Sequence, residues 1–365
     1  MTPLEAEIHQ TIAARGPLSI AKYMELCLGH EQHGYYMTRD PLGARGDFVT
    51  APEISQMFGE LIGLWAAQVW QLVGAPRTFQ LVELGPGRGT LMADALRAAR
   101  VAPGFRAALT VHLLETSPAL RARQNETLAD CGVPVQWIDH LISLPWEPSV
   151  IIANEFFDAQ PVHQAVKVSG GWRERKVALF GDRLAFVLDP QLMLRRDDVL
   201  PPGIRNAPTG AVFEWPSSEY DWMARQIGLR AVRDHGAALV IDYGHLETSP
   251  GDTFQAVSNH RHSDPLAAPG QVDLTAHVDF EALRLAATSE GARAHGPLPQ
   301  GEFLRRLGVV ERANRLKAQA TAEQAEAIDA ALQRLTAAGR TGMGEMFKVM
   351  AFAHPRLGQL PGFES

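Results

Sequence analysis

The feature that most constrains the fold is a short apolar run ending in a glycine-rich turn, Leu81-Val82-Glu83-Leu84-Gly85-Pro86-Gly87-Arg88-Gly89-Thr90. The run has the length of a buried strand, and residues 91–100 continue it with a helical pattern. Glycine is required where the backbone turns tightly or approaches a ligand closely. The sequence therefore predicts an α/β domain in which this turn binds a ligand at the carboxyl end of a strand.

Two classes of cofactor could occupy such a turn. A dinucleotide site has the pattern G-x-G-x-x-G, and its third glycine would fall at position 90, which is Thr90. S-adenosylmethionine (SAM) has no pyrophosphate and carries a positive sulfonium, so an acid at the strand end, here Glu83, suits it better. We therefore predict that Glu83, Gly85, Gly87 and Gly89 bind SAM, and a dehydrogenase is the least favoured function.

Strands and helices alternate along the middle of the chain. We predict strands at residues 79–84, 109–114, 133–138, 149–153, 237–242 and 346–352, with helices at 91–100, 118–129 and 217–235. This alternation indicates a parallel sheet covered by helices on both faces. The functional loops are then expected at the carboxyl ends of the strands.

The pattern divides the chain into three regions. Residues 1–75 are predicted to be a helical N-terminal extension with a turn-rich stretch, and residues 76–160 and 217–365 to be the SAM-binding domain. Residues 161–216 contain short runs separated by Gly-Gly and Gly-Asp, which is typical of antiparallel strands. We interpret them as a β-rich insertion that faces the substrate. The long segment 243–275 is rich in Gly, Pro and His and is expected to be functional or without regular structure.

Further cofactor ligands are predicted at the ends of the second and third strands. Glu115 ends the second strand, where an acid accepts hydrogen bonds from both ribose hydroxyls. Asp139 follows the third strand and is our candidate for the adenine amino group. Trp137 packs either on the adenine or in the core. An acid such as Glu115 also occurs in NAD enzymes. Only the glycine spacing and Glu83 therefore distinguish a SAM site from a dinucleotide site.

The fourth strand ends in a polar cluster, Asn154-Glu155-Phe156-Phe157-Asp158. Asn154 is a candidate cofactor ligand, and the alternative is that these residues cap a helix. If the methyl acceptor is an arginine, Glu155, Asp158 and Glu53 could localise the guanidinium charge on one nitrogen. For another nitrogen or an oxygen acceptor, His277 or Asp242 could act as the base. The residues alone leave these mechanisms open.

Composition excludes several classes of protein. The 365 residues carry a net charge of −7 and no basic run, so no nucleic-acid partner is expected. No apolar run reaches the ~18 residues of a membrane span. The first residues are acidic, unlike a signal or transit peptide, and we expect a cytoplasmic, bacterial-type protein. The two cysteines form no disulfide framework, and His260, His262 and His277 lack metal-ligand spacing, so no metal is expected.

Motifs along nearly the whole chain resemble the MidA-like family of SAM-dependent methyltransferases, which includes the mitochondrial complex I assembly methyltransferase. They are His33-Gly34-Tyr35-Tyr36, residues 46–60 (GDFVTAPEISQMFGE), the turn from Glu83 to Gly89, Asn154-Glu155-Phe156-Phe157-Asp158-Ala159, Asp242-Tyr243-Gly244, Asp264-Pro265-Leu266 and residues 273–280 (DLTAHVDF). The motifs outside the glycine turn are the more specific ones.

The resemblance implies a class I SAM-dependent methyltransferase fold: α/β and Rossmann-like, with a mostly parallel seven-stranded sheet, an N-terminal helical extension and a small antiparallel insertion. It also implies methylation of arginine in a protein, with a subunit of the respiratory NADH dehydrogenase as one candidate substrate. Residues 46–53 could then cover SAM with Thr50 and Glu53, or Glu53 or Ser55 could cap the following helix. The alternatives are a small-molecule methyltransferase and a SAM-binding assembly factor without turnover. The oligomeric state is left open, and a homodimer is one alternative.

Overall fold

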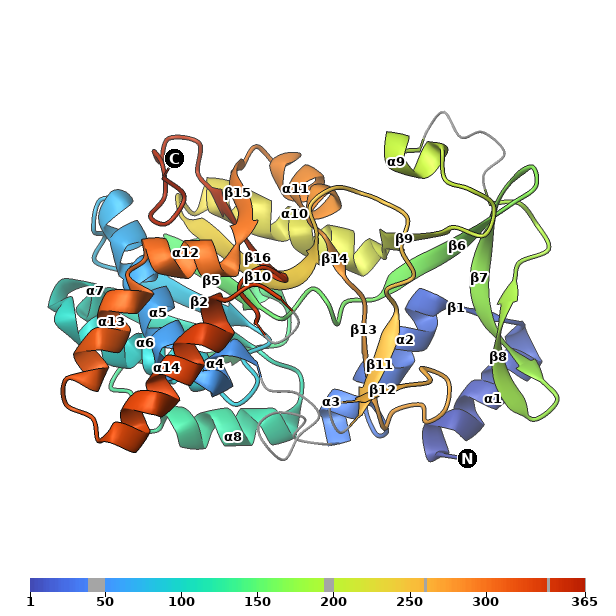
Figure 1. Cartoon of the computed structure of the whole chain (residues 1–365), viewed down its shortest axis with the longest axis horizontal. Coiled ribbons are helices and arrows are strands. Elements are labelled where there is room, and N and C mark those ends of the chain that lie inside the picture. The colour runs from blue at the N-terminus through green and yellow to red at the C-terminus, as the bar shows by residue number, and fades with distance from the viewer. Residues whose placement is uncertain (39–49, 194–199, 259–260, 340–341, 365) are drawn as a thin grey trace. The chain divides into compact units, whose positions relative to one another are not determined.

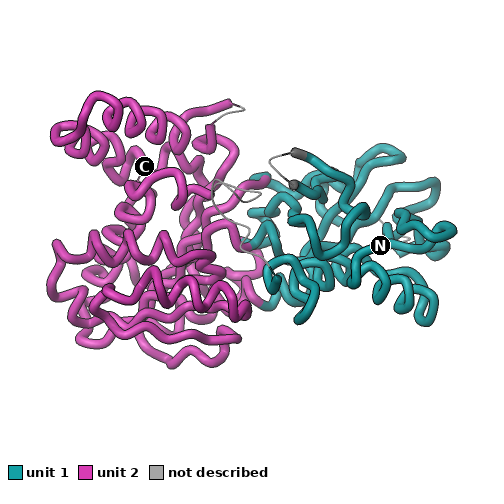
Figure 2. The backbone as a smooth tube through the Cα atoms, turned by 90° about the horizontal axis from the view of Figure 1, so that it is seen from below, with its two compact units in different colours: residues 1–48, 157–222, 245–283 teal, residues 49–156, 223–244, 284–365 magenta. Residues whose placement is uncertain are grey.

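The computed structural model describes residues 1–38, 50–193, 200–258, 261–339 and 342–364. The chain divides into two compact units, which Figure 2 shows in different colours. Unit 1 comprises residues 1–48, 157–222 and 245–283, and unit 2 comprises residues 49–156, 223–244 and 284–365. Unit 2 contains the glycine-rich turn, and unit 1 contains the predicted β-rich insertion.

Unit 2 is built on a mostly parallel sheet (Figure 1). Its strands are β2 (Phe79–Leu84), β3 (Leu109–Leu114), β4 (Val135–Ile138), β5 (Ser149–Asn154), β10 (Ala237–His245), β15 (Arg293–Pro299) and β16 (Phe347–Ala353). They follow the order β15-β16-β10-β5-β2-β3-β4. β2 pairs in parallel with both β3 and β5, whereas β16 runs antiparallel to β10 and β15. The predicted sheet is thereby confirmed, and its strand order reverses at β2.

The strands are apolar at nearly every position because both faces of the sheet are covered. β2 and β5 are buried along their whole length. Alternate residues of a strand point to opposite faces. Those on one face, including Leu81, Ile152 and Leu239, share a hydrophobic cluster with helices α5 (Gln56–Leu72) and α6 (Thr90–Ala98).

Ten helices contribute to unit 2 among the residues described. They are α4 (Ala51–Ile54), α5 (Gln56–Leu72), α6 (Thr90–Ala98), α7 (Pro103–Ala108), α8 (Pro118–Leu128), α12 (Gln300–Arg306), α13 (Val309–Lys317), α14 (Ala322–Thr336) and parts of α10 (Ser218–Arg233) and α11 (Phe280–Thr288). Serine caps fix where two of them begin. The Ser55 side chain accepts a hydrogen bond from the backbone of Met57, and that of Ser117 accepts one from Leu120.

Helix α5 lies unusually close to α6 because it has glycine at two contact positions. A Cβ atom at Gly63 would come within 2.5 Å of the backbone of Ala95, and one at Gly59 within 2.7 Å of the Asp94 side chain. Both distances are too short for a real Cβ contact. The two glycines therefore set the packing of α5 against the helix that starts at the glycine-rich turn.

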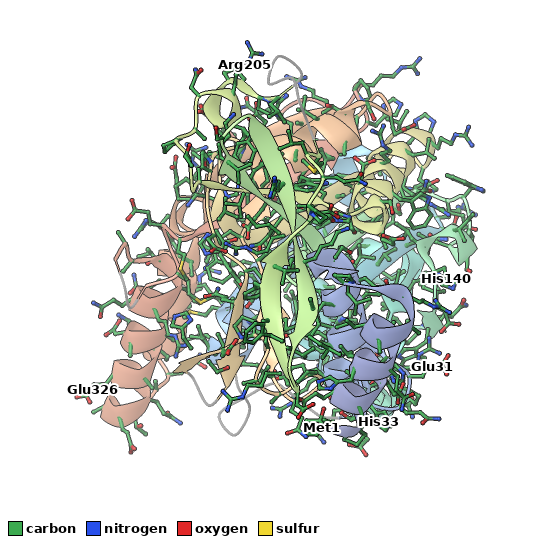
Figure 3. All side chains as sticks on the ribbon, turned by 90° about the vertical axis from the view of Figure 1, so that its right-hand side faces the viewer. Met1, Glu31, His33, His140, Arg205 and Glu326 are labelled. Atoms are coloured by element: carbon green, nitrogen blue, oxygen red, sulfur yellow. The ribbon has the colours of Figure 1, made fainter. Side chains whose placement is uncertain are left out.

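Unit 1 combines N-terminal helices with two antiparallel sheets. Its helices are α1 (Pro3–Arg15), α2 (Ile20–Gly29), α3 (Tyr35–Thr38) and α9 (Pro202–Arg205), and its strands are β1 (Leu18–Ser19), β6 (Val162–Val168), β7 (Gly171–Phe180), β8 (Arg183–Leu188), β9 (Val212–Pro216), β11 (Gln255–Ser258), β12 (Arg261–Ser263), β13 (Asp273–Thr275) and β14 (Val278–Asp279). One sheet has the order β1-β7-β6-β9 with β8 beside β7, and the other β12-β11-β13. Figure 3 shows β7 and β8 facing the viewer, and labels Glu31 and His33 on the N-terminal part.

The predicted strands of the insertion are present, but the chain is partitioned differently from the predicted regions. Residues 1–48 belong to unit 1 with the insertion, whereas residues 49–75 belong to unit 2 with the sheet. The segment 243–275 contains β11, β12 and β13, so the alternative that it lacks regular structure is wrong, and the alternative that it is functional stays a prediction. Its buried residues, such as Phe254 and Leu274, share a core with α1 and α2. The functional boundaries at 75, 160 and 216 stay a prediction.

A buried arginine connects α10 to the chain that leads into β5. Arg230 is completely buried and donates to the backbone oxygens of Leu141 (3.2 Å), Leu144 (2.6 Å) and Pro145 (2.9 Å). It also forms an ion pair with Asp234 at 3.4 Å. Removing the guanidinium would take the ion-pair partner from the buried Asp234 and a donor from each of the three backbone oxygens, of which those of Leu141 and Pro145 keep a backbone hydrogen bond from Leu144 and Glu147.

We therefore expect Arg230→Met to lower the free energy of unfolding by about 3–5 kcal/mol. Urea unfolding of the full chain, followed by circular dichroism, would measure the change. Arg233→Met is the matched control, because Arg233 is exposed and should change stability by less than about 0.5 kcal/mol. Equal effects of the two substitutions would contradict the role given to Arg230.

Candidate cofactor and active site

The glycine-rich turn connects β2 to α6 with three residues in the left-handed backbone region. The φ angles are +61° at Gly85, +53° at Gly87 and +80° at Gly89. Side chains are disfavoured at these angles, which explains the residue type. A Cβ at Gly85 would also lie 3.0 Å from the ring of Phe156. At its glycine positions, the turn therefore presents backbone atoms without side chains at the carboxyl end of β2.

Glu83 lies in β2 just before this turn and is 3% exposed. Within the described part of the chain, its Oε2 atom has no hydrogen-bond partner. Burial raises the pKa of this carboxyl group to about 8. A buried carboxylate without a partner is costly to ionise, and a cationic ligand group would remove that cost.

Glu115 follows β3 and has both carboxylate oxygens engaged. Oε1 accepts a hydrogen bond from the backbone nitrogen of Ser117 at 2.8 Å, and Oε2 accepts one from the Gln124 side chain at 3.1 Å. Glu115 is 7% exposed. Burial raises its pKa, and these hydrogen bonds oppose the rise. Each oxygen keeps further acceptor capacity, so the group can still take two hydroxyl donors.

The two residues predicted to contact the adenine have partners near Glu115. The Asp139 side chain is exposed and pairs with Arg121 at 2.6 Å, and Arg121 also donates to the backbone oxygen of Glu115 at 2.7 Å. The half-buried Trp137 donates its indole N–H to the side-chain oxygen of Gln124 at 2.8 Å. Both residues thus lie in the surroundings of Glu115, and their contact with adenine stays a prediction.

The end of β5 is strained. Glu155 has φ +50°, although it is not a glycine, and its backbone nitrogen donates to Ile241 at 2.9 Å. Its Oε1 accepts hydrogen bonds from the backbone nitrogen of Ala51 (3.1 Å) and the side chain of Asn154 (3.3 Å). No helix begins in residues 154–160, which are all described, so the alternative of helix capping by Asn154 is not met. Such backbone strain is common at functional sites.

A second carboxylate holds the short helix α4 against the glycine-rich turn. Glu53 accepts a hydrogen bond from the Thr90 hydroxyl at 2.6 Å and lies 3.8 Å from the Arg88 guanidinium. Thr50 precedes α4 without a side-chain capping bond, and Ser55 instead caps α5. The predicted covering loop lies partly outside the described residues, which resume at Thr50.

Unit 1 contains the two remaining candidates, Asp158 and His277. Asp158 is buried, and its backbone oxygen accepts a hydrogen bond from Ala276 at 2.9 Å. Tyr36 donates to Asp273 at 2.9 Å. Burial, with the negative charges of Asp273 and Asp158, raises the pKa of Tyr36.

His277 is held through its backbone. Its backbone nitrogen donates to the Thr253 hydroxyl at 2.9 Å, and that hydroxyl donates to the half-buried Glu214. The structure therefore brings the unit 2 candidates together around the ends of β2, β3 and β5, and places Asp158 and His277 in unit 1.

Several polar residues that interact with the candidate residues could not be picked out from the sequence. Tyr36 and Asp273 stood in recognised motifs, but nothing in the sequence paired them. Gln124 and Arg121 carried no signal, because polar residues on a helix are mostly solvent-exposed.

Asp242 is the other candidate base, and this role stays a prediction. Asp242 is completely buried in β10 and accepts a hydrogen bond from the backbone of Tyr243 at 2.9 Å.

Over the described ranges, no group of three or more His, Cys, Asp or Glu is arranged to hold a metal ion. His260 lies outside the described residues. No helix in the described part of the chain has the length and apolar character needed to cross a membrane.

The residues of unit 2 fit SAM. The unpartnered Glu83 carboxylate suits the cationic end, the glycine turn admits the close approach of a ligand, and Glu115 suits a ribose. When bound, SAM supplies the methyl group for transfer. The strand order, with β16 as the antiparallel strand, and this site define a class I SAM-dependent methyltransferase.

Comparisons with known proteins agree with the assignment to the SAM-dependent methyltransferases. The model of a family of S-adenosyl-L-methionine-dependent methyltransferases matches residues 61–298. The chain is 37% identical to the mitochondrial protein arginine methyltransferase NDUFAF7 homolog of Drosophila melanogaster, over 95% of this chain and 84% of that protein. It is 37% identical to NDUFAF7 of Homo sapiens, over 85% of this chain and 74% of that protein.

A solved structure extends the match to nearly the whole chain. A Burkholderia thailandensis protein bound to S-adenosyl-homocysteine superposes with a TM-score of 0.86 at 30% identity, over 99% of this chain and 94% of that one. The chain therefore belongs to the MidA-like family of SAM-dependent methyltransferases, and its cofactor is SAM.

The raised pKa of Glu83 predicts that SAM binding depends on pH. In the ligand-free protein, the Glu83 carboxyl group is mostly protonated below about pH 8. A cationic ligand favours the ionised form of this group. Binding should then release a proton, and affinity should rise up to about tenfold per pH unit between pH 6 and 8. Calorimetry in buffers of different ionisation enthalpy would measure the proton release.

Glu83→Gln is the control. It removes the titratable carboxyl group of residue 83, whereas the ionisable groups of SAM itself still titrate. We expect it to weaken SAM binding at pH 8.5 by at least tenfold and to remove the additional pH dependence. It should also stabilise the ligand-free protein, most strongly above pH 8, because no charge is then buried. Identical pH profiles of the variant and the wild type would refute this role of Glu83.

Proposed function

We propose that this protein transfers the methyl group of SAM to an arginine side chain of a protein. The observation that carries the proposal is that 37% identity to a protein arginine methyltransferase extends over 95% of the chain. It therefore includes unit 1 as well as the cofactor-binding unit. A shared cofactor site alone would not support a shared acceptor.

The chemistry of the acceptor requires carboxylates. The guanidinium of arginine is permanently charged, and it becomes nucleophilic when acids hold its charge on one side. Asp158 meets this requirement best in our proposal, with Asp273 and Tyr36 close to it in unit 1. Glu155 and Glu53 are the other candidates, and His277 would serve an acceptor that needs a base.

We further propose that the substrate is a protein, with a subunit of the respiratory NADH dehydrogenase as the first candidate. The family resemblance supports this choice, and residues 161–216 are the proposed substrate-facing part. The net charge of −7 favours a basic segment as the acceptor over a nucleic acid. The proposed compartment is the cytoplasm, and a homodimer is one proposed state of assembly.

Transfer of labelled methyl groups tests the proposal. Wild type and Glu115→Ala would each be incubated with labelled SAM and a lysate of a strain lacking this protein, followed by acid hydrolysis of the labelled bands. We expect methylarginine with the wild type and at least tenfold less label with the variant. Label only in small molecules would instead indicate a metabolite methyltransferase. No label, with SAM still bound, would indicate an assembly factor without turnover.

Asp158→Asn separates catalysis from cofactor binding. We expect kcat for peptide methylation to fall about 100-fold or more, since the guanidinium loses its charged partner. The Kd for SAM should stay within about threefold, because Asp158 lies outside unit 2. Glu25→Gln, an exposed acid of unit 1 paired with Lys22, is the matched control and should leave kcat unchanged. An unchanged kcat for Asp158→Asn would exclude Asp158 from catalysis.

A further inference from the structure

Gln124 is a fully buried amide in the middle of α8. A glutamine at such a position is unusual, because this side chain is mostly found on protein surfaces. Its Nε2 donates to the backbone oxygen of Gly87 at 2.7 Å and to Oε2 of Glu115 at 3.1 Å. Its Oε1 accepts from Nε1 of Trp137 at 2.8 Å. One side chain thus connects the glycine-rich turn with the ends of β3 and β4.

The orientation of this amide is determined by its partners. The indole N–H of Trp137 can only donate, so it must face the oxygen of the Gln124 amide. The backbone oxygen of Gly87 can only accept, so it must face the nitrogen. Trp137 and the backbone oxygen of Gly87 together therefore fix which end of Gln124 points toward Glu115.

This arrangement acts on Glu115. The backbone of Ser117 holds one carboxylate oxygen, and Gln124 holds the other. With both oxygens held, the remaining lone pairs have fixed directions and can receive two adjacent hydroxyl groups. The hydrogen bonds also favour the ionised form of a group whose pKa burial would otherwise raise further.

We propose that Gln124 is the positioning residue that makes the cofactor site selective for ligands with both ribose hydroxyls, acting through Glu115 and oriented by Trp137. The proposal rests on the cofactor site and on the predicted role of Glu115. It does not depend on which acceptor is methylated.

A purely structural role would have a different signature. If Gln124 only filled space beneath the turn, its loss would weaken every ligand equally. If it positions Glu115, its loss weakens only ligands that carry the ribose hydroxyls. The ratio of two dissociation constants therefore separates the two roles.

Calorimetry on the full chain measures this ratio with two probes: S-adenosyl-homocysteine and its analogue that lacks both ribose hydroxyls. For the wild type we expect a preference for S-adenosyl-homocysteine of about 100-fold. In Gln124→Leu, S-adenosyl-homocysteine should lose about 10–100-fold in affinity and the analogue less than about threefold. The loss should grow as the pH falls, because Glu115 then retains its proton more readily.

Gln80→Leu is the matched control. Gln80 is also buried, at 1% exposure, but it lies at the start of β2, away from the glycine-rich turn. This variant should keep the wild-type ratio. Trp137→Phe keeps an aromatic ring but removes the N–H group that helps to orient the amide, and it should reduce the preference about 3–10-fold.

The outcomes decide the proposal. A reduced ratio in Gln124→Leu, with a smaller reduction in Trp137→Phe, supports it. An unchanged ratio in a folded Gln124→Leu protein overturns it. If that variant does not fold, an unchanged ratio in Trp137→Phe overturns it instead. A wild type without preference for the hydroxyls also overturns it, whereas failure to methylate arginine has no effect on this measurement.

Discussion

Parallel pairing of β2 with β3 on one side and β5 on the other is the constraint on which the site depends. Because parallel strands share a direction, the carboxyl ends of these three strands meet at one edge of the sheet. The glycine-rich turn, Glu115 and the pair Asn154-Glu155 follow those ends directly. Residues far apart in sequence are thus brought together by the backbone alone, before any side-chain contact is formed.

The same edge of the sheet carries several features that are energetically unfavourable in the free protein. Glu83 is a buried acid with an oxygen that lacks a described partner, and Oδ1 of Asn154 is in the same condition. Glu155 has a backbone conformation that normally belongs to glycine. Features of this kind persist where function selects for them, since each lowers the stability of the free protein. A ligand that satisfies Glu83 would recover part of that cost.

Local patterns were enough to predict the framework of this site. The strand, turn and helix around Gly85 and the acid at Glu115 follow from residues that are adjacent in sequence. Contacts between distant residues could not be predicted in this way. Glu53 meets Thr90 across 37 positions, and Gln124 meets Gly87 across the same separation. Strands β11 to β13 were missed because each is only three or four residues long within a Gly-, Pro- and His-rich segment, and their pairing with one another defines them.

The hydrogen bonds of the acids help to separate their roles. Oε1 of Glu155 accepts the backbone N–H of Ala51, the first residue of α4, and so connects the end of β5 to that helix. Glu53 is similarly engaged by Thr90 and lies near Arg88. Both acids therefore suit the task of holding α4 beside the glycine-rich turn. Asp158 lies next to a tyrosine and a second acid instead, a setting in which an added cation relieves repulsion between like charges. This difference favours Asp158 as the group that meets a guanidinium, with Glu53 and Glu155 shaping the cofactor side.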